Sequence, residues 1–258
     1  MKTTKHKMAG LLVLGLALLL MNGCSWFKEL EVDKSPEELA EEGAAHLDAR
    51  RYSLAAETYQ KLKDRYPYSN LAVMAELKIA DAHYQNEAYI EAQAAYAEFQ
   101  KLHPSNEAAP YTAYQEGMCY FMRMTGFDRD QGPAEKAIET FARLQQTYPE
   151  SKYAGMALSR MTEAQESIAH HEFYVGEFYY KNGEYQAALG RFLGLLKNYA
   201  DTGYHAEAIN YIRNCREKIA EAELLAKQQA KPGEAPAEVP PDPLKNTSPG
   251  AEGPPAPF

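Results

Sequence analysis

The segment AAETYQKLKDRYP, residues 55–67, sets a spacing that recurs three times further along the chain. Ala55 is followed by Tyr59, Leu62 and Pro67, in steps of four, three and five residues. Steps of four and three place a small, an aromatic and an aliphatic side chain on one face of a helix, and a proline ends that helix. The later copies are Ala92, Tyr96, Phe99 and Pro104; Ala137, Phe141, Leu144 and Pro149; and Ala188, Phe192 and Leu195, with Ala200 in place of the proline.

A small residue lies upstream of each copy and allows a second helix to approach closely. These residues are Gly43, Ala80, Gly117 and Gly176. Each unit is therefore predicted to be a helix hairpin: a first helix through the small residue, a short turn, and a second helix that ends at the proline. The pattern resembles the tetratricopeptide (TPR) repeat, although Ala55 and Ala92 are 37 positions apart and the usual period is about 34. The third unit contains an insertion between its two helices.

The remaining helical patterns extend this array. Ser35-Pro36-Glu37-Glu38 is a capping box that predicts a helix start. Segment 152–169 runs into 172–181 without a proline, which predicts one long helix between the two halves, and 204–229 predicts a final helix that caps the stack. Valines are nearly absent from 35–231, which disfavours a sheet. The fold class predicted is all-α: a TPR-type α-solenoid of about five helix hairpins with a disordered C-terminal tail.

The N-terminus reads as a secretory leader. A basic start is followed by the uncharged run 8–21 and by Asn22-Gly23-Cys24-Ser25. The alternative is a transmembrane anchor over 8–27, but the apolar part of that stretch is too short to span. Gly23-Cys24 resembles the lipobox of bacterial lipoproteins, which implies a lipid on Cys24, and Ser25 resembles the signal of those sent to the outer membrane. We predict a signal peptide over 1–23, a lipidated tether over 24–34, the solenoid over 35–230 and a disordered tail over 231–258.

Charge and reactive residues exclude several functions. The net charge of -9 argues against nucleic-acid binding, which needs a basic surface. His170-His171-Glu172 predicts an interfacial or solvated pair rather than a metal site, because adjacent helical residues diverge. Asp128 and Asp130 in the insertion have several alternative interpretations. They could bind a cation or act in acid–base chemistry, or they could form a salt bridge or a helix cap. Cys119 and Cys215 are open to a disulfide or to two buried thiols. We predict no enzyme activity, no catalytic residue, no metal and no cofactor beyond the lipid.

Tyrosines are the more informative residues, because they favour recognition surfaces. In TPR geometry the first helix of each unit lines the concave groove. An extended apolar and aromatic peptide is predicted to bind there, with interhelix core as the alternative for some positions. The predicted groove residues are Leu77, Asp81 and Tyr84 in the second unit and Tyr114, Met118 and Phe121 in the third.

The lipobox, the hairpins and three further motifs together resemble the BamD family of bacterial outer-membrane lipoproteins. The motifs are Arg65-Tyr66-Pro67-Tyr68-Ser69, Phe127-Asp128-Arg129-Asp130 and Tyr148-Pro149-Glu150-Ser151-Lys152-Tyr153, with 174–183 also similar. The resemblance implies a lipid-anchored subunit of the β-barrel assembly machinery on the periplasmic face of the outer membrane. It implies that the N-terminal hairpins receive the C-terminal signals of unfolded barrel proteins and that other assembly lipoproteins are partners.

Two further residue roles follow from that resemblance. Arg191 falls where the family places an arginine that docks on a periplasmic POTRA domain of the barrel-forming subunit, and the alternative is an exposed surface charge. Tyr66 is the family-matched candidate at the substrate end. Periplasmic TPR adaptors of the Tol–Pal type carry similar turns and are the alternative function.

Overall fold

The computed structural model describes residues 34–199 and 202–229. The predicted signal peptide, Cys24, nearly all of the tether and the tail lie outside the described residues, as does Ala200. The described part is all-α, as predicted. Its helices are α2 (Pro36–Asp48), α3 (Tyr52–Arg65), α4 (Asn70–Gln85), α5 (Tyr89–Leu102), α6 (Ala109–Phe121), α7 (Gly132–Thr147), α8 (Lys152–Lys181), α9 (Tyr185–Asn198) and α10 (His205–Gln229).

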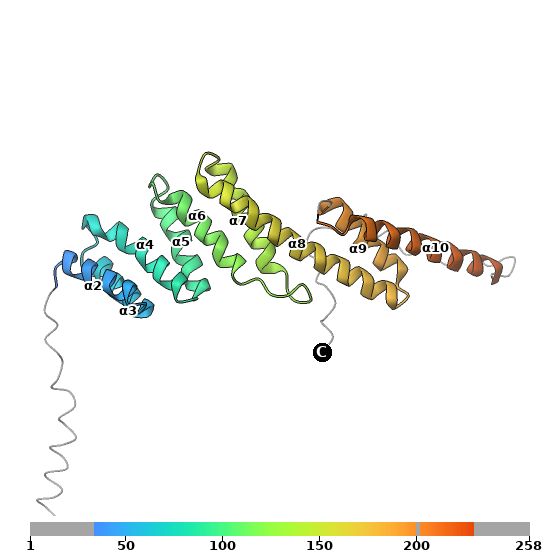
Figure 1. Ribbon diagram of the computed structural model, residues 1–258, viewed down its shortest axis with the longest axis horizontal. Helices are drawn as coiled ribbons and strands as arrows, with labels where there is room; N and C mark the ends of the chain where they lie inside the picture. Colours follow the sequence, from blue (N-terminus) through green and yellow to red (C-terminus); the bar gives the residue numbers. More distant parts are fainter. Residues whose placement is uncertain (1–33, 200–201, 230–258) are drawn as a thin grey trace, which may run out of the picture.

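The helices stack side by side into one elongated array, with α2 at one end and α10 at the other (Figure 1). Each helix packs against the next one in the chain. Four hairpins result, namely α2–α3, α4–α5, α6–α7 and α8–α9, and α10 packs against α9 as a final helix. This arrangement confirms the predicted solenoid and its closing helix, with four hairpins in the described residues where about five were predicted.

Local sequence sets the helix ends. The Ser35 hydroxyl accepts from the Glu38 N–H at 3.2 Å, while the Glu38 carboxylate accepts from the Ser35 N–H at 2.7 Å, so both halves of the predicted capping box form. Ser69 and Ser151 cap α4 and α8 through their hydroxyls alone, which accept from the N–H groups of Leu71 and Tyr153. Helices α3, α5 and α7 each end two positions before the expected stop proline, since a proline cannot continue the helical hydrogen bonding, and α9 likewise ends two positions before Ala200.

One contact recurs in every hairpin and forms its core. The aromatic residue of the second helix lies against the small residue of the first. Phe192 of α9 covers Gly176 of α8, and Tyr59 of α3 covers Gly43 of α2. The alanine, aromatic and aliphatic positions of all four copies are essentially inaccessible to solvent, so the sequence spacing corresponds to the interior of the array.

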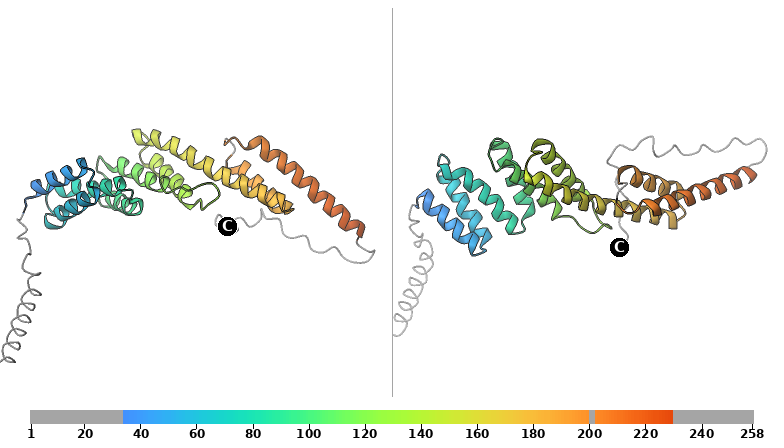
Figure 2. Two further views of the ribbon diagram at one scale, coloured as in Figure 1. Left: turned by 60° about the horizontal axis from the view of Figure 1, so that its bottom comes forward. Right: turned by 45° about the horizontal axis from the view of Figure 1, so that its top comes forward.

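Helix α8 joins the two halves as predicted, as one continuous helix of 30 residues. Its first part packs on α6 and α7, and its last part packs on α9. Two further views show α8 running through the middle of the array into the C-terminal part (Figure 2). Among the described helices, none is both long and apolar enough to cross a membrane.

The glycine contact can be tested within α8 itself. A Cβ atom on Gly176 would lie 2.8 Å from two carbons of the Phe192 ring, whereas one on Gly155 would meet nothing within 4 Å. Overpacking costs roughly 1–3 kcal/mol, so Gly176→Ala is expected to lower the free energy of unfolding by that amount. Gly155→Ala is the control and should raise it by up to about 1 kcal/mol. Equal values for the two variants in urea denaturation would contradict the close packing.

Candidate functional site

Arg191 of α9 lies beside Glu172 of α8 rather than projecting freely into solvent. Its Nη1 donates to both carboxylate oxygens of Glu172, each at 3.1 Å. The two side chains are only 28 % and 22 % exposed. Neither sequence alternative described this internal ion pair. The pair fixes the direction of the guanidinium and uses one of its nitrogens, while a guanidinium carries five N–H donors.

Two predicted groove residues are in the core, and their placement in the groove was wrong. Tyr114 and Met118 are 8 % and 9 % exposed, in a cluster with Phe141 and Leu144 of α7. The cause is Gly117, which lies between them in α6 and brings α7 close to both neighbours. The interhelix core, which was the alternative for such positions, describes these two residues.

Asp81 also has an internal role. Its Oδ1 accepts from the Tyr96 hydroxyl at 2.9 Å and from the Tyr111 hydroxyl at 2.8 Å. Burial, followed by the charge of Asp81, raises the pKa of both phenols, so they remain protonated donors. Leu77 is partly buried against the same cluster. Asp81 therefore ties α4 to α5 and α6, a network that sequence spacing did not predict.

Tyr84 and Phe121 remain partly accessible, and Arg160 joins them from α8. Both aromatic residues pack on the edge of the core around Phe141. The Arg160 guanidinium lies 5.2 Å from the centre of the Phe121 ring and pairs with Glu163 at 2.8 Å. First helices of three successive units thus meet at one aromatic and cationic surface. The sequence did not predict Arg160, because the fourth copy of the repeat is recognised from Gly176 onward. Arg160 lies in the part of α8 that precedes this position.

Tyr66 anchors the start of the array. It follows the last residue of α3, and its hydroxyl donates to the main-chain oxygen of Lys34 at 2.8 Å. The ring packs on the first core cluster beside Leu62 and Met74. Tyr66 therefore holds the described beginning of the chain against the second unit.

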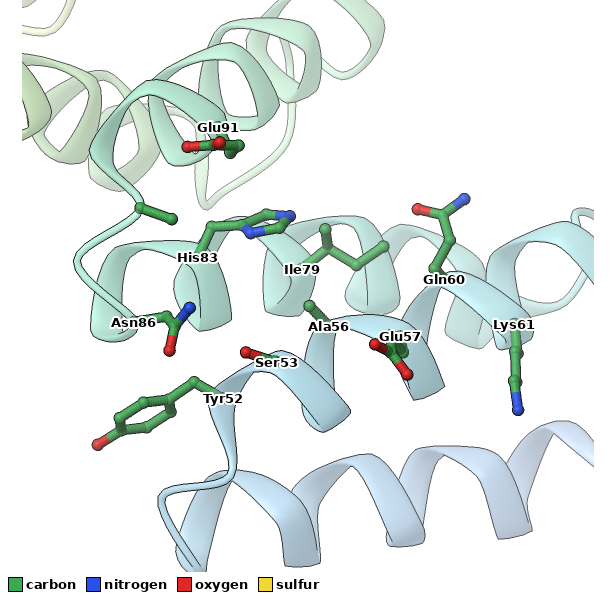
Figure 3. A pocket seen from close by; sticks show the side chains of 11 residues that line it. Tyr52, Ser53, Ala56, Glu57, Gln60, Lys61, Ile79, His83, Asn86 and Glu91 are labelled. Carbon is green, nitrogen blue, oxygen red and sulfur yellow. The ribbon is translucent and has the colours of Figure 1, made fainter.

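An open cavity of about 550 Å³ lies between α3, α4 and the start of α5 (Figure 3). Ile79 and Ala56 form part of its apolar floor, and His83 points into it. None of the predicted groove residues lines this cavity. Sequence reasoning missed it because its walls are polar residues of three helices that no motif connects.

The insertion before α7 is held against α8 by the two histidines. The ring of His170 stacks on Phe127 with centroids 3.6 Å apart, and Nδ1 of His171 donates to the Phe127 carbonyl oxygen at 2.6 Å. Ser167 donates to Gln131 at 3.1 Å from the same helix. This arrangement confirms an interfacial role for the pair. Asp130 accepts from the Gly132 N–H at 2.9 Å, which is the predicted helix-cap alternative.

Cys119 and Cys215 are two buried free thiols in separate clusters, so the thiol alternative holds and the disulfide does not. Burial raises the pKa of the Cys119 thiol to about 12 and also raises that of Cys215. No group of three or more His, Cys, Asp or Glu side chains suited to a metal ion occurs in the described ranges.

The thiol environment gives a chemical test. The thiolate is the reactive form of cysteine, and a pKa near 12 keeps Cys119 protonated at pH 8. We expect neither buried thiol of the Cys24→Ser chain to react with a disulfide reagent such as DTNB in the native state. Both should react in guanidinium. Rapid release of one equivalent of the reagent's coloured thiolate from native protein would contradict the burial of the two cysteines.

Stacked hairpins with aromatic residues packed on small ones define the chain as a TPR-type solenoid protein. A family model described as YfiO, outer membrane lipoprotein, matches residues 32–231. The chain belongs to this family, and the resemblance to BamD found in the sequence is confirmed.

Several proteins similar to this chain carry the name outer membrane protein assembly factor BamD. The protein from Neisseria meningitidis serogroup A is 30% identical over 208 residues, covering 77% of this chain and 78% of its own. The Vibrio cholerae protein is 29% identical over 197 residues, covering 72% and 82%. The Pasteurella multocida protein is 27% identical over 235 residues, covering 87% and 90%.

Proposed function

We propose that this chain is a non-enzymatic scaffold subunit of the outer-membrane β-barrel assembly complex. The observation that carries the proposal is the family match over residues 32–231, together with relatives named as outer membrane protein assembly factors. An elongated array with faces on several helices suits simultaneous contact with more than one protein. A lipid on Cys24 would hold this array at the periplasmic face of the outer membrane.

In this proposal the C-terminal part docks on a POTRA domain of the barrel-forming subunit through Arg191. The partly exposed ion pair with Glu172 supports the role, because it presents a guanidinium whose direction is already fixed. A partner carboxylate would then meet an oriented cation and lose little conformational entropy on binding.

The complex can be recovered from its native envelope. A pull-down from detergent-solubilised outer membrane is expected to contain the barrel-forming subunit. The Cys24→Ser chain lacks the site of the lipid and should disappear from the outer-membrane fraction. Recovery of a Tol–Pal partner without the barrel subunit would favour the periplasmic-adaptor alternative and contradict the proposal.

A charge swap separates docking from folding. The double variant Arg191→Glu with Glu172→Arg keeps an ion pair between α8 and α9 but reverses the charges that face a partner. We expect its melting temperature to remain near the wild-type value while recovery of the barrel-forming subunit falls at least about tenfold, equivalent to about 1.4 kcal/mol. Arg191→Ala is the comparison, since it leaves Glu172 without this cation. Undiminished recovery with the swap would remove Arg191 from the docking surface.

We further propose that the N-terminal hairpins bind the C-terminal signals of unfolded barrel proteins on the surface formed by Tyr84, Phe121 and Arg160. Two partly exposed rings suit the aromatic side chains of such a segment. The guanidinium of Arg160, paired with Glu163 and placed over the ring of Phe121, offers N–H donors to a peptide carboxylate.

Peptide affinity distinguishes this surface from the cavity at His83. Tyr84→Ala combined with Phe121→Ala is expected to weaken binding of a synthetic barrel-protein C-terminal peptide at least fivefold, about 1 kcal/mol, measured by fluorescence anisotropy. His83 lines the cavity, so His83→Ala is the control and should leave the affinity for the peptide unchanged. The reverse pattern would move the peptide site to the cavity.

A further inference from the structure

A second cavity, of about 440 Å³, lies between α8 and α10 at the C-terminal end of the array. Both helices pack on α9, and they meet each other through aromatic side chains. The ring of Tyr211 of α10 contacts those of Phe173 and Tyr180 of α8, with centroids 5.8 and 5.1 Å apart. All three rings line the cavity, so aromatic surface forms much of its lining.

The charged groups in this cavity are acidic. Glu177 of α8 and Glu207 of α10 line it from the two helices, and no lysine, arginine or histidine is found among the described residues of the lining. The Tyr211 hydroxyl donates to Oε1 of Glu177 at 2.6 Å. That hydrogen bond, followed by burial, raises the pKa of Tyr211 to about 12, so its phenol stays protonated. The cavity thus combines negative charge with aromatic surface.

Two cations near the cavity are already paired at its rim. Lys181 lies 3.3 Å from Oε2 of Glu177, but its side chain is 69 % exposed, and exposed pairs of this kind are weak. Arg213 donates to Oδ1 of Asn210 at 3.1 Å and is itself exposed. Neither cation lines the cavity, so the negative charge of the lining is left for a ligand to neutralise.

The rings are held in place before a ligand arrives. Tyr211 stacks on Phe192 of α9, with centroids 4.8 Å apart and planes 10° from parallel. Phe192 is itself fixed in the hairpin core against Gly176, and the Tyr211 hydroxyl is tied to Glu177. This stack covers only one face of the Tyr211 ring. A rigid aromatic surface of this kind binds with a small entropic cost.

This combination of groups favours a guanidinium as the ligand. A cation is attracted to the face of an aromatic ring, and a planar guanidinium stacks on the ring while its N–H groups point outward. Those N–H groups form charge-assisted hydrogen bonds with carboxylate oxygens, which Glu177 and Glu207 supply. The amide of Asn214 adds an acceptor on the side of α10. A lysine ammonium is a more strongly hydrated point charge and uses this geometry less well.

The cavity is separate from the Arg191 ion pair. Glu172, which holds Arg191, and Glu177, which lines the cavity, are five positions apart in α8. At about 100° per residue, five positions correspond to about 140° around the helix axis. The two carboxylates therefore lie on different sides of α8, and a ligand in the cavity leaves the Arg191 pair accessible.

We infer that the cavity between α8 and α10 binds an arginine side chain of a partner protein. The guanidinium lies against the rings of Tyr180 and Tyr211 and donates to the carboxylates of Glu177 and Glu207. Charge complementarity identifies this occupant, since the described lining holds two acidic side chains and no basic one. The site is a contact additional to the proposed one at Arg191 and does not depend on it.

Titration with a defined peptide tests the inference. The probe is a blocked pentapeptide, glycine–alanine–arginine–alanine–glycine, added to the full lipidated chain in detergent micelles. Binding is followed by NMR through the side-chain amide of Asn214, which lines the cavity. We expect saturable binding of this peptide. Replacing its arginine by citrulline, which has a similar shape without the charge, or by lysine should weaken binding at least about tenfold.

Paired variants assign the binding to the carboxylate and to the ring. Glu207 is exposed, so Glu207→Gln should leave the fold intact and weaken binding of the arginine peptide at least about fivefold. Its matched control is Glu223→Gln, which removes the same charge from an exposed position of α10 outside the cavity and should change nothing. Tyr180→Leu should also weaken binding at least about fivefold, whereas Tyr180→Phe keeps the ring and should keep the affinity.

Equal affinity for the arginine and citrulline peptides would overturn the inference, as would full affinity of Glu207→Gln and Tyr180→Leu. Sedimentation gives a further check, because the chain is expected to be monomeric. A dimer that Glu207→Gln dissociates would assign the site to an arginine of a second copy and overturn the assignment to a partner protein. The double variant Arg191→Glu with Glu172→Arg should bind the peptide normally, so failure here is distinguishable from failure of the proposed docking.

Discussion

The close approach of two helices at one small residue is the constraint on which the rest of the array depends. A ring such as that of Phe192 can approach the backbone of its partner helix closely only where that helix carries no large side chain, as at Gly176. The distance between the helices of a hairpin is therefore set by a single position per unit. Because each hairpin rests on the previous one, that distance also sets the pitch of the whole solenoid.

Continuity of α8 follows from the same packing and has a functional consequence. A helix of 30 residues that contacts α7 near its start and α9 near its end couples the two halves as one rigid element. The insertion braces its middle through His170 and His171. The proposed peptide surface at Tyr84 and Phe121 and the proposed docking surface on α9 would thereby be held at a defined separation.

The sequence predicted the fold well and the candidate site only in part, for a physical reason. Spacing of alanine, aromatic and aliphatic residues reports one helix face, and that face is the interior of each hairpin. A solenoid helix also contacts the preceding and following units, so it has more than one buried face. Tyr114 and Met118 flank Gly117 and lie in a cluster shared by α7 of their own hairpin and α8 of the next, and no periodicity distinguishes their positions from a groove. Partners distant in sequence, such as Glu172 for Arg191, are likewise invisible before the helices are placed.

The Arg191–Glu172 ion pair gives the docking hypothesis a physical basis. A fully exposed, flexible cationic side chain would lose conformational entropy each time it contacted a partner. Exposed ion pairs therefore contribute little binding free energy. A guanidinium already held by a neighbouring carboxylate has spent that entropy during folding, and its planar fork presents further N–H groups in a fixed direction. A partner carboxylate would also meet the negative charge of Glu172, so only one approach, along the free edge of the fork, is favourable. The pair thus selects geometry more than it adds affinity, which is the property a scaffold needs where two subunits must meet in one orientation.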